Sequence, residues 1–185
     1  TVKIIDHSKD YFKSLLFTIR KSIDSKIKEL HNPETAALLK GLILADRSEI
    51  SFDTKTEFIN TGVIHVLAVS GLHVGYILII VVFAFGRFGI YTRAFLTILA
   101  LLFFMLLTGA SPSVTRATIM SIVIIIAFIT NRSTNLLNSI SLAAIIILFI
   151  NPDELFNPGF QLSFSAVISI AVIYPIFQKS VDSLK

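Results

Sequence analysis

A serine and two histidines stand in the first half of an apolar run at residues 64–85. They are His65, Ser70 and His73, and the run is long enough for a helix to cross a bilayer. Polar groups in hydrocarbon cost free energy unless they find partners. An ionisable residue at membrane depth is therefore a candidate functional residue, and we expect these side chains to face protein or water.

The spacing of these side chains allows several kinds of chemistry. Ser70 and His73 are three residues apart and can touch on a helix, but no acidic residue nearby would orient the histidine of a protease-like pair. A metal site would need a third ligand, and no carboxylate lies in any apolar run. We therefore predict no catalysis, no metal and no cofactor here. The structural alternative for His65 and His73 is hydrogen bonding to neighbouring helices.

Two glycines lie beside these polar residues. Gly71 and Gly75 form a Gly-x-x-x-Gly motif, which lets the backbone of another helix approach closely. We therefore assign this pair to helix packing.

Arg116 is the only formal charge inside an apolar run. It follows a break at Ser111, Pro112 and Ser113, where unpaired backbone groups must face protein or water. Two interpretations stay open for Arg116. Its side chain extends to the near interface, or its guanidinium faces a polar path that suits a phosphate-bearing substrate. Gln161, at the mouth of the last apolar run, likewise has two possible roles, interfacial hydrogen bonding and substrate contact.

The composition is that of a membrane protein. Hydrophobic residues make up 54% of the chain and charged residues 15%, and the mean hydropathy is +0.81. There is no cysteine, which excludes disulfides and thiolate metal sites. The net charge of +4 is too small for a strongly basic nucleic-acid-binding surface. The chain starts without Met or a signal peptide, so we expect a piece of a longer protein.

The hydropathy pattern predicts an all-α, polytopic membrane protein in two parts. Residues 1–61 hold most of the charges and predict short amphipathic helices, which either pack on their neighbours or lie in the headgroup layer. Residues 62–185 predict a transmembrane helical bundle. Its five apolar segments are 64–85, 94–110, 114–130, 136–150 and 160–177.

Charges between the apolar segments alternate. Basic residues occur in loops 86–93 and 131–138 and after residue 177, whereas the 110–113 turn is uncharged and the 151–159 loop is acidic. Because basic loops stay in the cytoplasm, we predict that residues 1–61 lie at the outer face of the membrane.

Four ordered stretches resemble one family. The run from His65 to Gly75 resembles the signature of the ComEC-type competence proteins, the inner-membrane channels through which bacteria take up single-stranded DNA in natural transformation. Residues 36–47, 109–120 and 151–164 resemble further motifs of that family, in the family's order. The resemblance covers roughly residues 34–177.

The resemblance implies that this chain is part of a DNA-uptake channel in the bacterial inner membrane. The implied partners are single-stranded DNA, lipid, further domains of the full-length chain, a DNA receptor, a cytoplasmic translocase and a second copy of the protein. The family's His-x-His-x-Asp-His nuclease pattern is absent from this stretch, so we expect no enzymatic activity from it. The alternatives are a multi-span transporter of a small anion and a structural membrane anchor. The candidate substrate-path residues are His65, Ser70, Gly71, His73, Arg116 and Gln161, with Gly75, Ser111, Pro112 and Ser113 as a structural motif.

Overall fold

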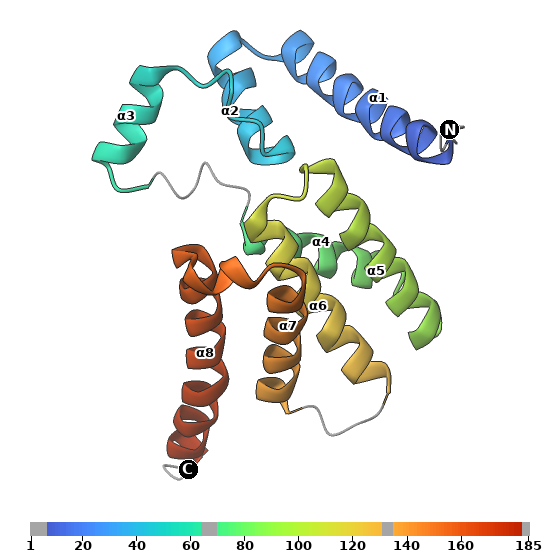
Figure 1. The fold of residues 1–185 in the computed structure, drawn as a ribbon, viewed down its shortest axis with the longest axis vertical. Coiled ribbons are helices and arrows are strands. Elements are labelled where there is room, and N and C mark those ends of the chain that lie inside the picture. The colour runs from blue at the N-terminus through green and yellow to red at the C-terminus, as the bar shows by residue number, and fades with distance from the viewer. Residues whose placement is uncertain (1–6, 64–69, 131–134, 183–185) are drawn as a thin grey trace, which may run out of the picture.

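The computed structural model describes residues 7–63, 70–130 and 135–182, and every regular element in these ranges is helical (Figure 1). The predicted all-α class is therefore confirmed. The elements are α1 (His7–Leu30), α2 (Pro33–Leu44), α3 (Phe52–Asn60), α4 (Gly71–Ala84), α5 (Ile90–Leu107), α6 (Pro112–Ile129), α7 (Leu136–Ile150), the 3₁₀ helix η2 (Pro152–Phe156) and α8 (Pro158–Asp182).

The N-terminal helices begin at capping side chains. The Asn32 side chain accepts a hydrogen bond from the backbone N–H of Thr35 at 2.8 Å, and Pro33 occupies the first turn of α2. The Ser51 hydroxyl caps α3 by accepting from the N–H of Thr54 at 3.1 Å. These side chains satisfy backbone donors that have no partner inside the helix.

Within the described residues, three helices are long and apolar enough to cross a membrane, namely α5, α6 and the first 18 residues of α8. The other two apolar helices are shorter, with 14 residues in α4 and 15 in α7. At 1.5 Å per residue, α4 is only about 21 Å long, which underfills a hydrocarbon core of about 30 Å. The described part of the predicted 64–85 segment is thus a short helix that starts at Gly71, and residues 64–69 lie outside the description.

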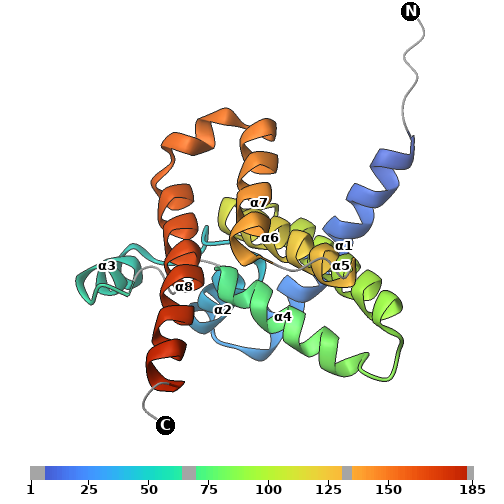
Figure 2. The same cartoon turned by 90° about the horizontal axis from the view of Figure 1, so that it is seen from below.

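The central element of the bundle is α6, which packs against α4 and α5 on one side and against α7 and α8 on the other (Figures 1 and 2). Each side has its own apolar core. Val74, Leu101 and Val114 form the core shared with α4 and α5. The core shared with α7 and α8 consists of Met120, Val123, Ile140, Ala143, Ile147, Phe160 and Phe164.

The first three helices lie at one end of the bundle, near the α5–α6 turn (Figure 1). A Cβ atom built at Gly109 in this turn would lie 3.3 Å from Arg20 Nη1 of α1. Arg20 also donates to the backbone oxygen of Leu44 at 3.2 Å. The side chain of Arg20 therefore links α1 both to the end of α2 and to the bundle.

Ion pairs hold α1 against α2. Lys40 of α2 is 4% exposed, and its Nζ lies 2.9 Å from Asp24 Oδ1 of α1, 2.7 Å from Glu49 Oε1 and 3.7 Å from Asp46 Oδ2. In α1, Ile27 is buried, whereas Leu15 and Phe17, nearer its start, are exposed. Among the described side chains of α1, Ile27 is thus the one apolar residue that is buried.

One loop boundary differs from the sequence prediction. The helix α5 begins at Ile90, so Arg93 lies in its first turn and not in an 86–93 loop. The Arg93 side chain has a long aliphatic stem, which a helix end at a membrane interface accommodates.

Candidate functional site

Ser70 and His73 together cap the start of α4. The backbone N–H of Leu72 donates to Ser70 Oγ at 3.3 Å, and the backbone N–H of Ser70 donates to His73 Nδ1 at 3.3 Å. This reciprocal arrangement is a capping box, with His73 in the position usually held by Glu or Gln. The third polar residue of this stretch, His65, lies outside the described residues.

The two glycines of the Gly-x-x-x-Gly motif differ in their surroundings. A Cβ atom at Gly71 would lie 3.3 Å from the Cβ of Ala117 in α6, which is tighter than ordinary packing. At Gly75, no described atom lies within 4 Å of the corresponding position. Close helix approach therefore depends on Gly71, and the predicted contribution of Gly75 to packing is not seen among the described residues.

A tight turn immediately precedes α6. Gly109 and Ala110 both adopt left-handed backbone angles, with φ of 68° and 52°. Pro112 then occupies the first helical position, which suits its fixed φ and missing N–H. Ser111 stands in the cap position without a capping hydrogen bond, and its buried hydroxyl has no partner among the described residues. Ser113 lies in the first turn of α6.

Arg116 is 7% exposed and forms an ion pair with Glu154 of η2. Its Nη1 donates to Glu154 Oε2 at 3.1 Å, while Nε is buried with no partner in the described part of the chain. The guanidinium is enclosed beside a carboxylate, and both interpretations of Arg116, extension to the near interface and contact with a phosphate-bearing substrate, stay predictions.

The link between α7 and α8 is built around this ion pair. The Asn157 side chain donates to Glu154 Oε1 at 3.3 Å and accepts from the N–H of Gly159 at 2.8 Å. A Cβ atom at Gly159 would lie only 2.9 Å from Arg116 Nη2. A side chain at position 159 would therefore have to displace the end of the Arg116 side chain from the start of α8.

A cavity of about 190 Å³ adjoins the ion pair. Its polar wall comes from Arg116, Glu154, Asn151 and Thr115, and its apolar wall includes Ile147. Arg116 is thus the one cation of this wall and Glu154 the one carboxylate. A small polar group could enter here, but a phosphate would have to compete with Glu154 for the guanidinium.

Gln161 lies close to this region but makes a different contact. Its Nε2 donates to the backbone oxygen of Leu155 at 3.0 Å, and the residue is exposed. This bond ties the first turn of α8 to η2. Both roles considered for Gln161, interfacial hydrogen bonding and substrate contact, stay predictions.

The structure groups the candidate residues into two sets. Ser70, Gly71 and His73 lie at the junction of α4 with α6, whereas Arg116 lies where α6 meets η2 and α8. Sequence reasoning did not join Glu154 or Gly159 to Arg116. A signal for Glu154 was present, because Asp153 and Glu154 are the only acidic residues between positions 63 and 181, and a buried arginine needs a counter-ion.

The fold and these sites define an all-α membrane protein with several apolar helices. The model of the Competence protein family matches residues 42–185, more than half of the chain, and the chain therefore belongs to that family.

Two relatives extend this comparison. The chain is 37% identical over 176 residues to "ComE operon protein 3" of Bacillus subtilis (strain 168), an alignment that covers 94% of this chain and 23% of that protein. It is 30% identical over 162 residues to an uncharacterized protein of Aquifex aeolicus (strain VF5), which covers 86% of this chain and 39% of that protein. No solved structure matches the chain.

Proposed function

We propose that this chain forms part of a channel that carries single-stranded DNA across the bacterial inner membrane during natural transformation. The observation that carries the proposal is the match of residues 42–185 to the Competence protein family. The chain spans 23% and 39% of the lengths of the two relatives. The proposal therefore assigns α4–α8 to one portion of the channel wall, and other parts of a longer protein complete it.

The helix junctions support a transport role for this portion. Close contact at Gly71 brings the capped start of α4 against α6, and the ion pair at Arg116 joins α6 to η2. Both junctions hold non-helical backbone at the ends of helices. A bilayer tolerates such backbone only where it lies against protein or a water-filled cavity. A polar path for a strand would run beside such segments.

A role for Arg116 in contacting the strand is compatible with this proposal under one condition. The guanidinium would have to exchange Glu154 for a DNA phosphate, since the carboxylate already occupies one of its nitrogen atoms. Such an exchange would make the contact transient, which a moving strand requires.

The proposal is tested in a naturally transformable host that expresses the intact protein. We expect Gly71→Leu to abolish transformation and entry of labelled single-stranded DNA, because a bulky side chain forces α4 away from α6, while the protein still reaches the membrane. Gly75→Ala is the matched control and should transform normally, because no described atom lies within 4 Å of its added Cβ.

Two results would contradict the proposal. Normal DNA entry with Gly71→Leu at wild-type protein levels would leave the chain with the role of an anchor. Loss of uptake of a small labelled anion, with DNA entry unaffected, would instead identify an anion transporter.

A further inference from the structure

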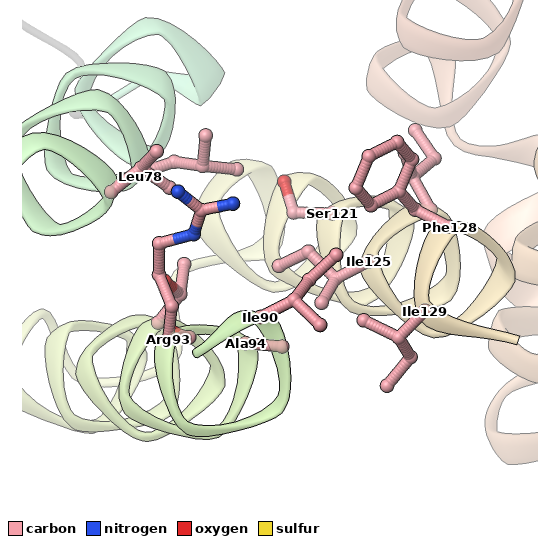
Figure 3. Close-up of a pocket in the computed structure, with 11 residues that line it drawn as sticks. Leu78, Ile90, Arg93, Ala94, Ser121, Ile125, Phe128 and Ile129 are labelled. Atoms are coloured by element: carbon pink, nitrogen blue, oxygen red, sulfur yellow. The ribbon is translucent and has the colours of Figure 1, made fainter. Parts of the chain in front are cut away.

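A second cavity, of about 400 Å³, lies between α4, α5 and α6 (Figure 3). Its walls are mostly aliphatic and aromatic, and include Leu78 of α4, Ile90 of α5 and Phe128 of α6. The volume is within the range of about 300–1,000 Å³ typical of small-molecule sites. None of the residues discussed above as candidate substrate-path residues lines it.

One cation faces this apolar space. Figure 3 shows the Arg93 side chain extending from α5 across the cavity towards Leu78, with the Ser121 hydroxyl pointing into the same space. Among the described residues, no carboxylate forms an ion pair with Arg93. This separates Arg93 from Arg116, which has Glu154 as its counter-ion. An unpaired guanidinium against apolar walls is unfavourable unless an anion or water reaches it.

The cavity opens towards the surface that lipid would contact. Phe128 is 60% exposed and Ile90 40% exposed, although both line the cavity. Both residues lie at the ends of α5 and α6 that are remote from the α5–α6 turn. This is the end that carries Arg87 in the α4–α5 turn, and basic residues of that kind mark the cytoplasmic leaflet.

We propose that this cavity binds an anionic phospholipid of the cytoplasmic leaflet. The headgroup phosphate accepts hydrogen bonds from the Arg93 guanidinium in the first turn of α5, and an acyl chain passes Phe128 and Ile125 and continues deeper into the bilayer, past Leu78 and Ser121. A phosphate carried on a hydrocarbon chain matches both parts of the cavity, the single cationic fork and the long apolar wall. The polar phosphates and bases of a DNA strand would leave that wall unmatched.

The test measures lipid retained by the intact protein. The protein is purified in detergent, mixed with phosphatidylglycerol or phosphatidylcholine, and examined by native mass spectrometry. We expect preferential retention of phosphatidylglycerol, and about fivefold weaker retention by Arg93→Gln, the effect of one basic residue near the headgroups. Arg87→Gln is the matched control, since Arg87 is exposed in the turn and does not line the cavity. Ser121→Phe keeps Arg93 but fills the cavity, and should also lower retention.

Several outcomes would overturn the proposal. Equal retention of the two lipids, or equal loss with Arg93→Gln and Arg87→Gln, would reduce the effect to general surface charge. Displacement of the lipid by inorganic phosphate alone would show that the acyl chain contributes nothing. Displacement by a single-stranded oligonucleotide would assign the cavity to the strand. A wild-type protein that retains no phosphatidylglycerol would show that another segment fills the cavity.

Discussion

Arg116 illustrates how a single charge organises a membrane-embedded site. Removing a charge from water costs several kcal/mol unless a partner and hydrogen bonds compensate. In this protein Glu154 supplies the partner at 3.1 Å, and the side-chain amide of Asn157 supports the carboxylate. Removing either member of the ion pair therefore leaves the other uncompensated.

We expect Arg116→Gln to lower the free energy of unfolding by about 3 kcal/mol, the cost of leaving a largely buried charge without its partner. Glu154→Gln alone should act in the same direction. The double variant should recover part of the loss, because both charges are gone. Thermal unfolding of the purified variants in detergent measures the coupling between the two residues.

Transformation assays on the same variants separate the two roles of Arg116. A positioning role predicts that uptake follows protein stability and recovers in the double variant. If Arg116→Gln abolishes uptake at unchanged stability and Glu154→Gln leaves uptake intact, direct contact with phosphate is the better explanation.

The two glycines of α4 give a second prediction at this scale. Gly71→Ala should destabilise the protein by about 1 kcal/mol, because its Cβ would meet Ala117 at 3.3 Å and one of the two helices must shift. Gly75→Ala should be neutral or stabilising by up to about 1 kcal/mol, since alanine is the better helix former. Denaturation of the two variants side by side compares them. A larger loss at position 75 would contradict the packing described here.

At the scale of elements, α4 starts with a capped turn in a stretch whose hydropathy predicts a longer helix. The mean hydropathy of the apolar run 64–85 does not indicate where the helix starts. The start depends on two polar side chains that cap the backbone. Ser70 and His73 satisfy backbone N–H groups that would otherwise be unpaired at membrane depth. The polar residues that suggested chemistry are thus explained first by helix geometry.

We expect His73→Gln to preserve the fold and DNA uptake, because a glutamine side chain can accept the same backbone hydrogen bond. His73→Ala and Ser70→Ala should each cost about 1 kcal/mol. Thermal unfolding and transformation frequency are measured for all three variants. If His73→Gln is as defective as His73→Ala, the imidazole itself carries a function beyond capping.

The pairing of α1 with α2 depends on charge. The ion pair with Lys40 lowers the pKa of Asp24 below its ordinary value of 3.8, and hydrogen bonds from Lys40 and Lys28 lower the pKa of Glu49 below 4.5. Burial acts to lower the pKa of Lys40, but the hydrogen bonds that Lys40 donates to Asp24 and Glu49 prevail and raise its pKa above 10.5. The charges of Asp24, Glu49 and Lys40 therefore contribute fully to the packing of α1 on α2 between about pH 5 and pH 10.

We expect α1 to separate from α2 as the pH falls below 4, because the two carboxylates then take up protons and lose their attraction for Lys40. Spin labels on Thr18→Cys and Ile43→Cys report the distance between the helices. Lys40→Met is the control, and should weaken the pairing at pH 7 and remove the acid-dependent step. A distance that stays constant at every acidic pH at which the helices remain folded would contradict this account.

The sequence predicts which helices form better than it predicts which residues meet in the candidate functional site. Hydropathy and periodicity correctly predict amphipathic helices in residues 1–61, because these signals are local. The partnership of Arg116 with Glu154 joins residues 38 positions apart, and Gly159 matters only once α8 is in place. Tertiary contacts of this kind leave no periodic signal, although the scarcity of acidic residues was a usable hint.

At the scale of the whole molecule, the two ends of the bundle differ in charge. The α5–α6 turn, η2 and α1–α3 lie towards one end, which includes Glu154 and the Lys40 cluster. The other end carries Arg87 and Arg93. This separation agrees with the alternation of loop charges and with the placement of residues 1–61 outside the cytoplasm, which stays a prediction.

We expect Ser25→Cys to react with an impermeant thiol reagent added to intact cells or spheroplasts, and Arg87→Cys to react only after the membrane is permeabilised. Both positions are exposed, and this chain has no cysteine of its own to add background. The reverse pattern of labelling would invert the orientation, and would move the lipid site at Arg93 to the opposite leaflet.

The two unlike faces of α6 have a consequence for how a substitution acts. One face contributes Val114 to the core with α4 and α5, and the other contributes Met120 and Val123 to the core with α7 and α8. Because the two cores share a backbone but no side chain, a change in one reaches the other only through displacement of α6 itself. We therefore expect a substitution that shifts α6 to disturb both cores, whereas one that changes only the packing of α4 or of α7 against it should disturb one core alone.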